Sequence, residues 1–261
     1  HPVQHPDHLP VLWVHGRDPM ILNGDALTIL PTIPAASVDI VVTDPPFAIE
    51  FSGTPANYNR NDANVIAGYH EISQSEYPAF TRSWVQEAWR VLKPNGCMYI
   101  VSGWSNLNDI LTAVKEVGFT TVNHVIWQFQ FGVFTRTKYV SSHYHVLFVV
   151  KNPRHYTYHL ECRHPLSERT KDGRSANYAD REDVWYIPRE FWPGQKKTAT
   201  KLPEALVEKI LAYSSSPGDV VLDPFLGSGT VGVVAQRMGR RWIGIEIVDA
   251  YAEFAADRVK A

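Results

Sequence analysis

The chain has 261 residues, of which 44% are hydrophobic, 12% aromatic and 20% charged, and this composition is typical of a folded globular protein. It excludes a disordered or fibrous protein, and no apolar stretch reaches the roughly 18 to 20 residues that a membrane span needs. The net charge of -2 does not by itself indicate a nucleic-acid partner. We expect one domain with an elaboration, or two small domains, and no membrane partner.

In chain order, short apolar strands alternate with helical patterns as far as Val150. The chain begins with His1 and not with Met, so we expect residues 1–10 to be a trimmed or tag-derived start without structural weight. The alternation predicts βαβ units around a mostly parallel sheet. The predicted elements are a strand over residues 38–43, a helix over 77–92, a strand over 97–101, a helix over 107–117, and strands over 122–127 and 146–150.

The pattern changes after Lys151, because residues 151–201 are polar and rich in Arg, His and aromatic side chains. This tract carries 11 Lys and Arg against 7 Asp and Glu, which suits either a locally bound anionic ligand or an ordinary solvated surface. We expect it to be an insert or a small recognition subdomain. Regular elements then return, with a helix over 202–214, a strand over 220–222, a glycine loop, a helix over 230–238, a strand over 242–245 and a helix over 250–259.

The two cysteines cannot form a disulfide framework, which favours an intracellular, cytoplasmic protein. Cys97 lies in an apolar strand, and we expect it to be an inert core residue. Cys162 lies within ten residues of His155, His159 and His164, but their spacing matches no standard zinc pattern. We therefore expect no metal site.

The glycine loop over residues 223–230 follows a strand and opens a helix, where glycines let the backbone approach a nucleotide-like ligand. Glu246 ends the next strand, 23 residues after Asp223, and can accept hydrogen bonds from the ribose hydroxyls of an adenosine. Val233 stands where a dinucleotide loop has its third glycine, and Asp223 would repel a pyrophosphate but suits an ammonium group. These features favour S-adenosylmethionine, with another nucleotide loop or a structural turn as the alternatives.

The strand over residues 38–43 runs directly into Asp44-Pro45-Pro46-Phe47. The two prolines remove backbone donors, so this segment presents two acceptors, the Asp44 carboxylate and the Pro45 carbonyl, beside an aromatic ring. Two acceptors can each take one N–H of the exocyclic amine of adenine or cytosine and so free its lone pair to attack a methyl sulfonium. Phe47 would stack on the base. By itself the tetrapeptide could also be a proline-rich turn.

These motifs carry a family resemblance. Residues 41–47 resemble the catalytic motif of amino-group DNA methyltransferases, and residues 222–230 resemble their S-adenosylmethionine motif. The order of catalytic motif, recognition region and cofactor motif is similar to the permuted order of the beta class. Residues 23–27, 90–96 and 143–151 are similar to the cofactor-adenine segment, the turn after the catalytic motif and the strand before the recognition region.

The resemblance implies a Rossmann-like α/β methyltransferase sheet, mostly parallel and with circularly permuted motifs. Residues 1–150 would form the catalytic half of the methyltransferase domain, residues 151–197 a target-recognition insert and residues 198–261 the cofactor-binding half. The chain departs from the family at Phe47, where Tyr is usual, and at residues 198–203, where His-Pro-Thr-Gln-Lys-Pro is usual.

The function that the resemblance implies is site-specific methylation of duplex DNA from S-adenosylmethionine, by flipping the target base out of the helix. In the family, a leading Asp tends to accompany adenine N6, so Asp44 favours adenine. N4 of cytosine, an RNA substrate, a nucleotide-binding oxidoreductase and a catalytically idle DNA-binding protein are the alternatives. A homodimer and a cognate restriction endonuclease remain open as partners. We expect residues 48–73 to form a mobile lid over the base, or else a passive surface loop.

The expected site residues fall into three sets. The catalytic residues are Asp44, Pro45, Pro46 and Phe47. The cofactor-binding residues are Asp25, Ala26, Asp44, Thr200, Asp223, Pro224, Phe225, Gly227, Ser228, Gly229, Thr230, Glu246 and Ile247. The DNA-binding residues are Arg163, Arg169, Lys171, Arg174 and Arg181, in a tract where Arg189, Tyr156, Tyr158, Tyr178, Trp185 and Tyr186 also suit a reader of duplex DNA.

Overall fold

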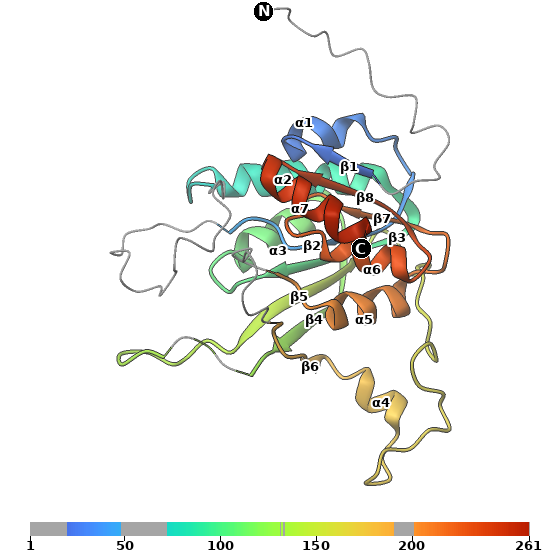
Figure 1. The fold of residues 1–261 in the computed structure, drawn as a ribbon. Coiled ribbons are helices and arrows are strands. Elements are labelled where there is room, and N and C mark those ends of the chain that lie inside the picture. Colours follow the sequence, from blue (N-terminus) through green and yellow to red (C-terminus); the bar gives the residue numbers. More distant parts are fainter. Residues whose placement is uncertain (1–19, 48–71, 131, 133, 191–200, 261) are drawn as a thin grey trace, which may run out of the picture.

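The strands form one sheet, and nearly all of them end at the same edge. The computed structural model describes residues 20–47, 72–130, 132, 134–190 and 201–260, so the expected start at residues 1–10 and residues 48–71 of the expected lid lie outside the described residues. Within them, the sheet has eight strands in the order β1-β8-β7-β2-β3-β5-β4-β6 (Figure 1). The strands are β1 (Met20–Asn23), β2 (Val38–Thr43), β3 (Leu92–Ser102), β4 (Thr120–Gln128), β5 (His143–Val150), β6 (Val184–Tyr186), β7 (Val220–Asp223) and β8 (Arg241–Glu246).

All paired neighbours in the sheet are parallel except at β5, which runs antiparallel to β3 and to β4. Residues 129–142 lead straight back from β4 to the adjacent β5, and neighbours joined in this way are antiparallel. The predicted mostly parallel α/β sheet is confirmed. Because every other strand runs in one direction, their carboxyl ends share one edge of the sheet, which is where ligands bind in such folds.

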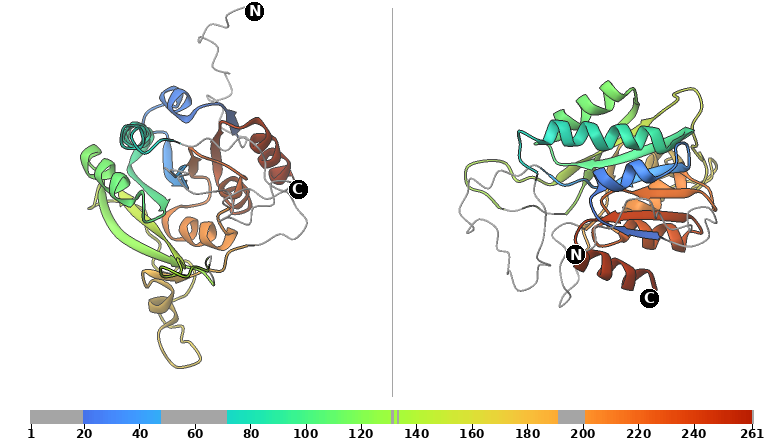
Figure 2. Two further views of the ribbon diagram at one scale, coloured as in Figure 1. Left: turned by 90° about the vertical axis from the view of Figure 1, so that its left-hand side faces the viewer. Right: turned by 90° about the horizontal axis from the view of Figure 1, so that it is seen from above.

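Helices cover both faces of the sheet and give two hydrophobic cores (Figure 2). On one face lie α1 (Ala26–Ile29), the 3-10 helix η2 (Leu30–Thr32), α2 (Tyr77–Val91) and α3 (Leu107–Val117). On the other lie α5 (Glu204–Ser214), α6 (Thr230–Arg237) and α7 (Asp249–Lys260). In β2, Val41 faces the first core whereas Ile40 and Val42 face the second, so a strand buried on both sides is apolar throughout. No helix in the described part of the chain is long and apolar enough to cross a membrane.

The structure differs from the predicted elements mainly where these are short. The strand predicted over residues 97–101 begins at Leu92, because a register shift between Val38 and Ile40 of β2 accommodates the residues before Cys97. Pro94 and Gly96 within this stretch conceal its strand character. β1, α1, η2, β6 and α4 (Ala176–Asp180) were not predicted, since three to five residues are too few to reveal a period.

The segment over residues 151–190 is anchored to the rest of the protein through Asp180. The Asp180 carboxylate accepts hydrogen bonds from the Tyr213 hydroxyl at 2.6 Å and from Arg163 Nε at 3.0 Å, and it lies 3.4 Å from Lys209 Nζ. Burial alone would raise the pKa of Asp180, but these partners hold it below its usual value. At its end the segment adds β6 to the sheet, parallel to β4. The recognition insert that the sequence predicts therefore packs against α5 and extends the sheet.

Candidate active site

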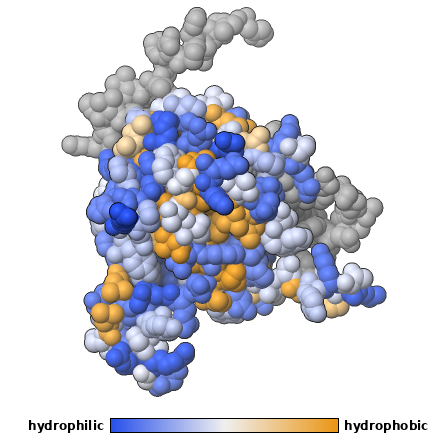
Figure 3. All heavy atoms as spheres, turned by 180° about the vertical axis from the view of Figure 1, so that it is seen from behind, coloured by the Kyte–Doolittle hydropathy of each residue, from blue (hydrophilic) through white to orange (hydrophobic). Residues whose placement is uncertain are grey.

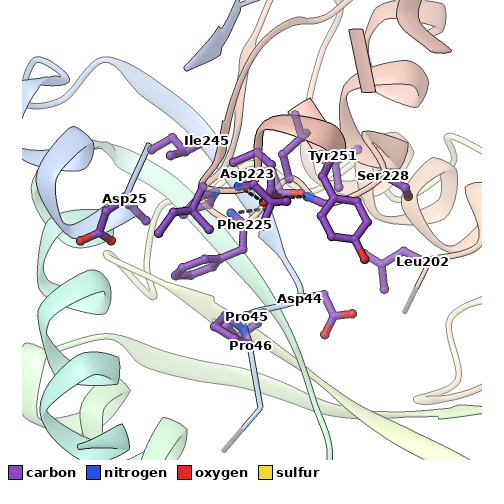
Figure 4. Close-up of a pocket in the computed structure, with 18 of the residues that line it drawn as sticks. Asp25, Asp44, Pro45, Pro46, Leu202, Asp223, Phe225, Ser228, Ile245 and Tyr251 are labelled. Atoms are coloured by element: carbon purple, nitrogen blue, oxygen red, sulfur yellow. Dashed lines mark hydrogen bonds between the residues drawn. The ribbon is translucent and has the colours of Figure 1, made fainter. Parts of the chain in front are cut away.

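Three acidic residues meet at the carboxyl edge of the sheet because they follow three neighbouring strands. Glu246 ends β8, Asp223 ends β7, and Asp44 comes directly after β2. All three line one open cavity of about 1100 Å³ (Figure 4). The topology thus unites a motif near the start of the chain with two residues near its end, as the predicted permuted motif order requires.

Glu246 holds the glycine loop in place. Its Oε2 accepts a hydrogen bond from the backbone N–H of Gly227 at 2.8 Å, and its Oε1 accepts one from the N–H of Val248 at 2.9 Å. Gly227 has a φ of 52°, which favours glycine, and a side chain there would meet nothing closer than Phe225 O at 4.0 Å. The space over Gly227 is therefore open to a ligand. Burial raises the pKa of Glu246.

Gly229 has a different role from the one that the sequence predicts, because it does not line the cavity. It has a φ of 83° and immediately precedes α6. A Cβ on it would lie 2.8 Å from Cβ of Ala255, so Gly229 allows α6 and α7 to pack closely. The glycine loop thus has one glycine facing the cavity and one serving the fold.

Asp223 connects two strands beneath the cavity. It is only 3% exposed, and its Oδ1 accepts hydrogen bonds from the Thr43 hydroxyl at 2.9 Å and from the N–H of Phe225 at 3.0 Å. Burial raises its pKa to about 7 despite these hydrogen bonds. A buried carboxylate of this kind favours a cationic ligand nearby.

Asp44 differs from the other two acids because one of its acceptors lacks a partner. Its Oδ1 is buried and accepts no hydrogen bond from the described residues. Burial and the adjacent Asp223 raise the pKa of Asp44 to about 7, whereas the positive charge of Arg189 opposes this rise. A buried acceptor without a partner costs free energy, so its presence beside a cavity indicates that a ligand supplies the donor.

Aromatic rings beside Asp44 form a wall that ends in Arg189. The ring of Phe47 lies 6.1 Å from that of Tyr144, which lies 5.3 Å from Phe129. The guanidinium of Arg189 stacks 4.5 Å from the Phe129 ring and donates to the Tyr144 hydroxyl at 3.1 Å. The sequence placed Arg189 only in the basic tract, because nothing in its spacing shows that it returns to the catalytic motif.

The predicted DNA-binding residues lie away from the cavity, in the projecting segment around α4 (Figure 1). Arg163 pairs with Asp180, and Arg181 donates to Asn177 Oδ1 at 2.8 Å, so both hold the segment together. Arg169 donates to backbone carbonyls of its own turn, whereas Lys171 and Arg174 are exposed. In this segment His159 hydrogen-bonds Ser216, and no cluster of His, Cys, Asp and Glu side chains in the described ranges could hold a metal ion.

The sequence model of the DNA methylase family, whose members methylate N6 or N4 amino groups, matches residues 38–257. The chain belongs to this family. The match contains Asp44, the glycine loop and Glu246, so the three acids of the cavity all lie within the family region. The family that the motifs predicted is confirmed.

Individual relatives of this DNA methylase agree with the assignment. The type II methyltransferase M.HinfI of Haemophilus influenzae is 30% identical over 252 residues, which cover 92% of this chain and 68% of that protein. M.HpaI of Haemophilus parainfluenzae, also a type II methyltransferase, is 28% identical over 245 residues, covering 93% and 74%. The putative DNA modification methylase TTHA0409 of Thermus thermophilus, complexed with S-adenosyl-L-methionine, is 26% identical and has a TM-score of 0.67, with 93% of each chain covered. The predicted fold class is confirmed.

Most residues that the sequence singled out for this methylase line the cavity. They are Asp25, Ala26, Asp44, Pro45, Pro46, Phe47, Asp223, Pro224, Phe225, Gly227, Ser228, Thr230, Glu246 and Ile247. Thr200 lies outside the described residues. The sequence missed Phe80 of α2, Leu202 and Tyr251 of α7, which also line the cavity. Their spacing fits ordinary amphipathic helices, so only the fold identifies them.

The electrostatic role of Arg189 can be tested by titrating Asp44. We expect Arg189→Gln to raise the pKa of Asp44 above its value of about 7, because removing a nearby cation disfavours the carboxylate. Carbon-13 NMR of labelled aspartate carboxyls measures this pKa, with the Asp44→Asn spectrum identifying the resonance. Arg174→Gln, which removes an exposed cation of the α4 segment, is the control and should leave the titration unchanged. An unchanged titration in Arg189→Gln would contradict the assignment.

Proposed function

We propose that the protein is a site-specific methyltransferase that transfers a methyl group from S-adenosylmethionine to N6 of adenine in duplex DNA, after flipping the base out of the helix. The observation that carries the proposal is the Asp44 carboxylate, whose buried Oδ1 lacks a hydrogen-bond partner among the described residues. It shares a cavity with the glycine loop and Glu246, so a target amine and a cofactor can meet there. The paired amine of adenine is unreachable within the stack, which makes base flipping necessary.

The cofactor fits the side of the cavity formed by β7, β8 and the start of α1. Gly227 leaves the space above it open, and Glu246 presents carboxylate oxygens that can accept from ribose hydroxyls while holding the loop amides. Asp25, which caps α1 through the N–H of Leu27 at 3.0 Å, lines the same cavity and can accept from the adenine amine. S-adenosylmethionine supplies an electrophilic methyl group on a sulfonium. The complex of TTHA0409 with this cofactor supports the choice.

The residues of β2 and its continuation prepare the target amine. Asp44 Oδ1 and the Pro45 carbonyl would each accept one N–H, drawing the nitrogen away from conjugation with the ring so that its lone pair becomes available. Phe47 and Tyr144 offer an aromatic surface for the base. Because burial and Asp223 raise the pKa of Asp44 to about 7, its carboxylate can also take the proton that the nitrogen loses.

The choice of adenine rests on the leading Asp44 of the motif and on its family resemblance. The exocyclic amine of cytosine offers the same two N–H groups, so N4 of cytosine is the alternative base, and RNA is the alternative polymer. We propose residues 151–197 as the target-recognition insert between the catalytic half, residues 1–150, and the cofactor half, residues 198–261. The two Haemophilus relatives are type II methyltransferases, which supports a partnership with a restriction endonuclease.

The products formed by Asp44 variants test this function. Unmodified DNA and RNA are incubated with isotope-labelled S-adenosylmethionine, and the nucleosides are identified by mass spectrometry. We expect labelled N6-methyladenine from DNA, no turnover with Asp44→Ala, and weak turnover with Asp44→Asn, whose amide oxygen still accepts one N–H. Cofactor affinity of Asp44→Ala should stay within about tenfold. Near-normal turnover in Asp44→Ala would contradict the mechanism, and labelled N4-methylcytosine would correct the base.

The recognition role is tested by reversing charges in the α4 segment. Arg163 pairs with Asp180 and is avoided, so we choose Arg169, Lys171 and Arg174, which are exposed. We expect their combined change to Glu to abolish DNA binding and to leave cofactor affinity unchanged, because each lost phosphate contact lowers the log-log salt slope by about 0.9.

The matched control for this triple variant carries the same charge change on exposed cations of the helical faces. It replaces Arg82, Lys115 and Lys260 by Glu. We expect binding of duplex DNA by this control to stay close to that of the unchanged protein at about 0.15 M salt, where charges beyond about 8 Å are screened. Equal losses in both triple variants would place recognition outside the α4 segment.

A further inference from the structure

Exposed aromatic side chains gather at the edge of the sheet that carries the cavity. Trp104 follows β3 and is 74% exposed, and the loop after β4 exposes 78% of Phe134 and 98% of Tyr139. β4 runs in the same direction as β2, since both β3 and β4 are antiparallel to β5. The loop after β4 therefore opens at the same edge as Asp44. Large exposed apolar side chains grouped in this way indicate an interaction surface.

The loop after β4 is a projecting hairpin with a positively charged tip. At its base, the N–H of Phe129 donates to Ser142 O at 3.0 Å, and a Cβ on Gly132 would lie 1.8 Å from Ser141 O, so the two arms run close together. Residues 129–142 contain Arg136 and Lys138 but neither Asp nor Glu. Both cations are exposed, and the loop stands out from the lower right of the molecule in Figure 3. We call residues 134–140 the hairpin tip.

The base of this hairpin is continuous with the catalytic motif. Phe129 begins the loop and Tyr144 lies just after it, and their rings pack against each other at 5.3 Å. Tyr144 in turn packs against Phe47 at 6.1 Å. A duplex whose base reaches Phe47 would therefore lie beside the hairpin. Aromatic rings flanked by cations suit nucleic acid, because the rings stack on bases and the cations neutralise phosphates.

We propose that the hairpin tip is a wedge that enters the duplex at the target base pair. Tyr139 occupies the stacking space that the flipped base leaves, and Arg136 and Lys138 contact the flanking phosphates. The inference rests on the proposed function, because a wedge is needed only if the target base leaves the duplex. Apolar side chains inserted between base steps recover part of the stacking that unstacking loses. The absence of acidic residues from residues 129–142 favours DNA over an acidic protein surface as the occupant.

The test compares two substrates of the same sequence, chosen from DNA that the protein is found to methylate. One is a fully paired duplex, and the other has an abasic site opposite the target base, so that no base pair has to be broken. We expect Tyr139→Ala to lower kcat/KM on the paired duplex by about tenfold or more, and by less than about threefold on the abasic duplex. Tyr139→Phe should keep the activity of the unchanged protein, because its ring still stacks.

The control is Tyr178→Ala, which removes another exposed tyrosine, on α4, with 66% of its surface accessible. We expect it to change both substrates by the same factor, if it changes them at all. Thermal unfolding and cofactor binding of Tyr139→Ala should match those of the unchanged protein, since an almost fully exposed side chain contributes little to packing.

Equal losses of Tyr139→Ala on both substrates, or no loss on either, would overturn the wedge and leave the methyltransferase function standing. A change of oligomeric mass in Tyr139→Ala, measured by sedimentation, together with equal losses on both substrates would show that a second copy of the chain covers the tip instead. Failure of the unchanged protein to methylate any DNA would overturn the proposed function itself. A selective loss on the paired duplex supports the wedge.

Discussion

The structure depends on the burial of three carboxylates at the ends of adjacent parallel strands. β8, β7 and β2 bring Glu246, Asp223 and Asp44 to one cavity, although Asp44 is far from the other two in the sequence. Each acid is buried beside another negative charge or close to one, which raises the pKa of all three. Backbone N–H groups stabilise Glu246 and Asp223, whereas Asp44 Oδ1 lacks such a partner among the described residues. The site is therefore strained toward binding donors and cations.

The sheet topology explains how a permuted sequence builds this site. β7 pairs with β2, so the segment that follows the recognition region completes the sheet at its centre. Thr43 of β2 donates its hydroxyl hydrogen bond to Asp223 of β7 at 2.9 Å, which joins the catalytic and cofactor motifs directly. The reversal at β5 then turns the chain back, so that Phe129 and Tyr144 lie beside Phe47. Recognition elements extend from the same side of the molecule as the aromatic wall.

Much of this could be predicted from the sequence because its strongest signals are local. Buried strands read as apolar runs, and the catalytic tetrapeptide and the glycine loop are continuous segments whose residues line the cavity. The roles of Arg189 and Gly229 could not be predicted, because each depends on a distant partner, Tyr144 for the one and Ala255 for the other. β6 was missed for a related reason, since its three residues become a strand only by pairing with β4.

The most direct measurement is the number of protons released when the cofactor binds, obtained by calorimetry at pH 7 in buffers of different ionisation enthalpy. Acids whose pKa lies near 7 in the empty cavity are partly protonated, and a bound cation favours their charged form. S-adenosylmethionine carries a sulfonium charge that S-adenosylhomocysteine lacks. The account predicts greater proton release with S-adenosylmethionine, and a smaller difference between the two ligands in Asp44→Asn. Equal release by both ligands in the unchanged protein would contradict the placement of the reactive sulfonium beside these carboxylates.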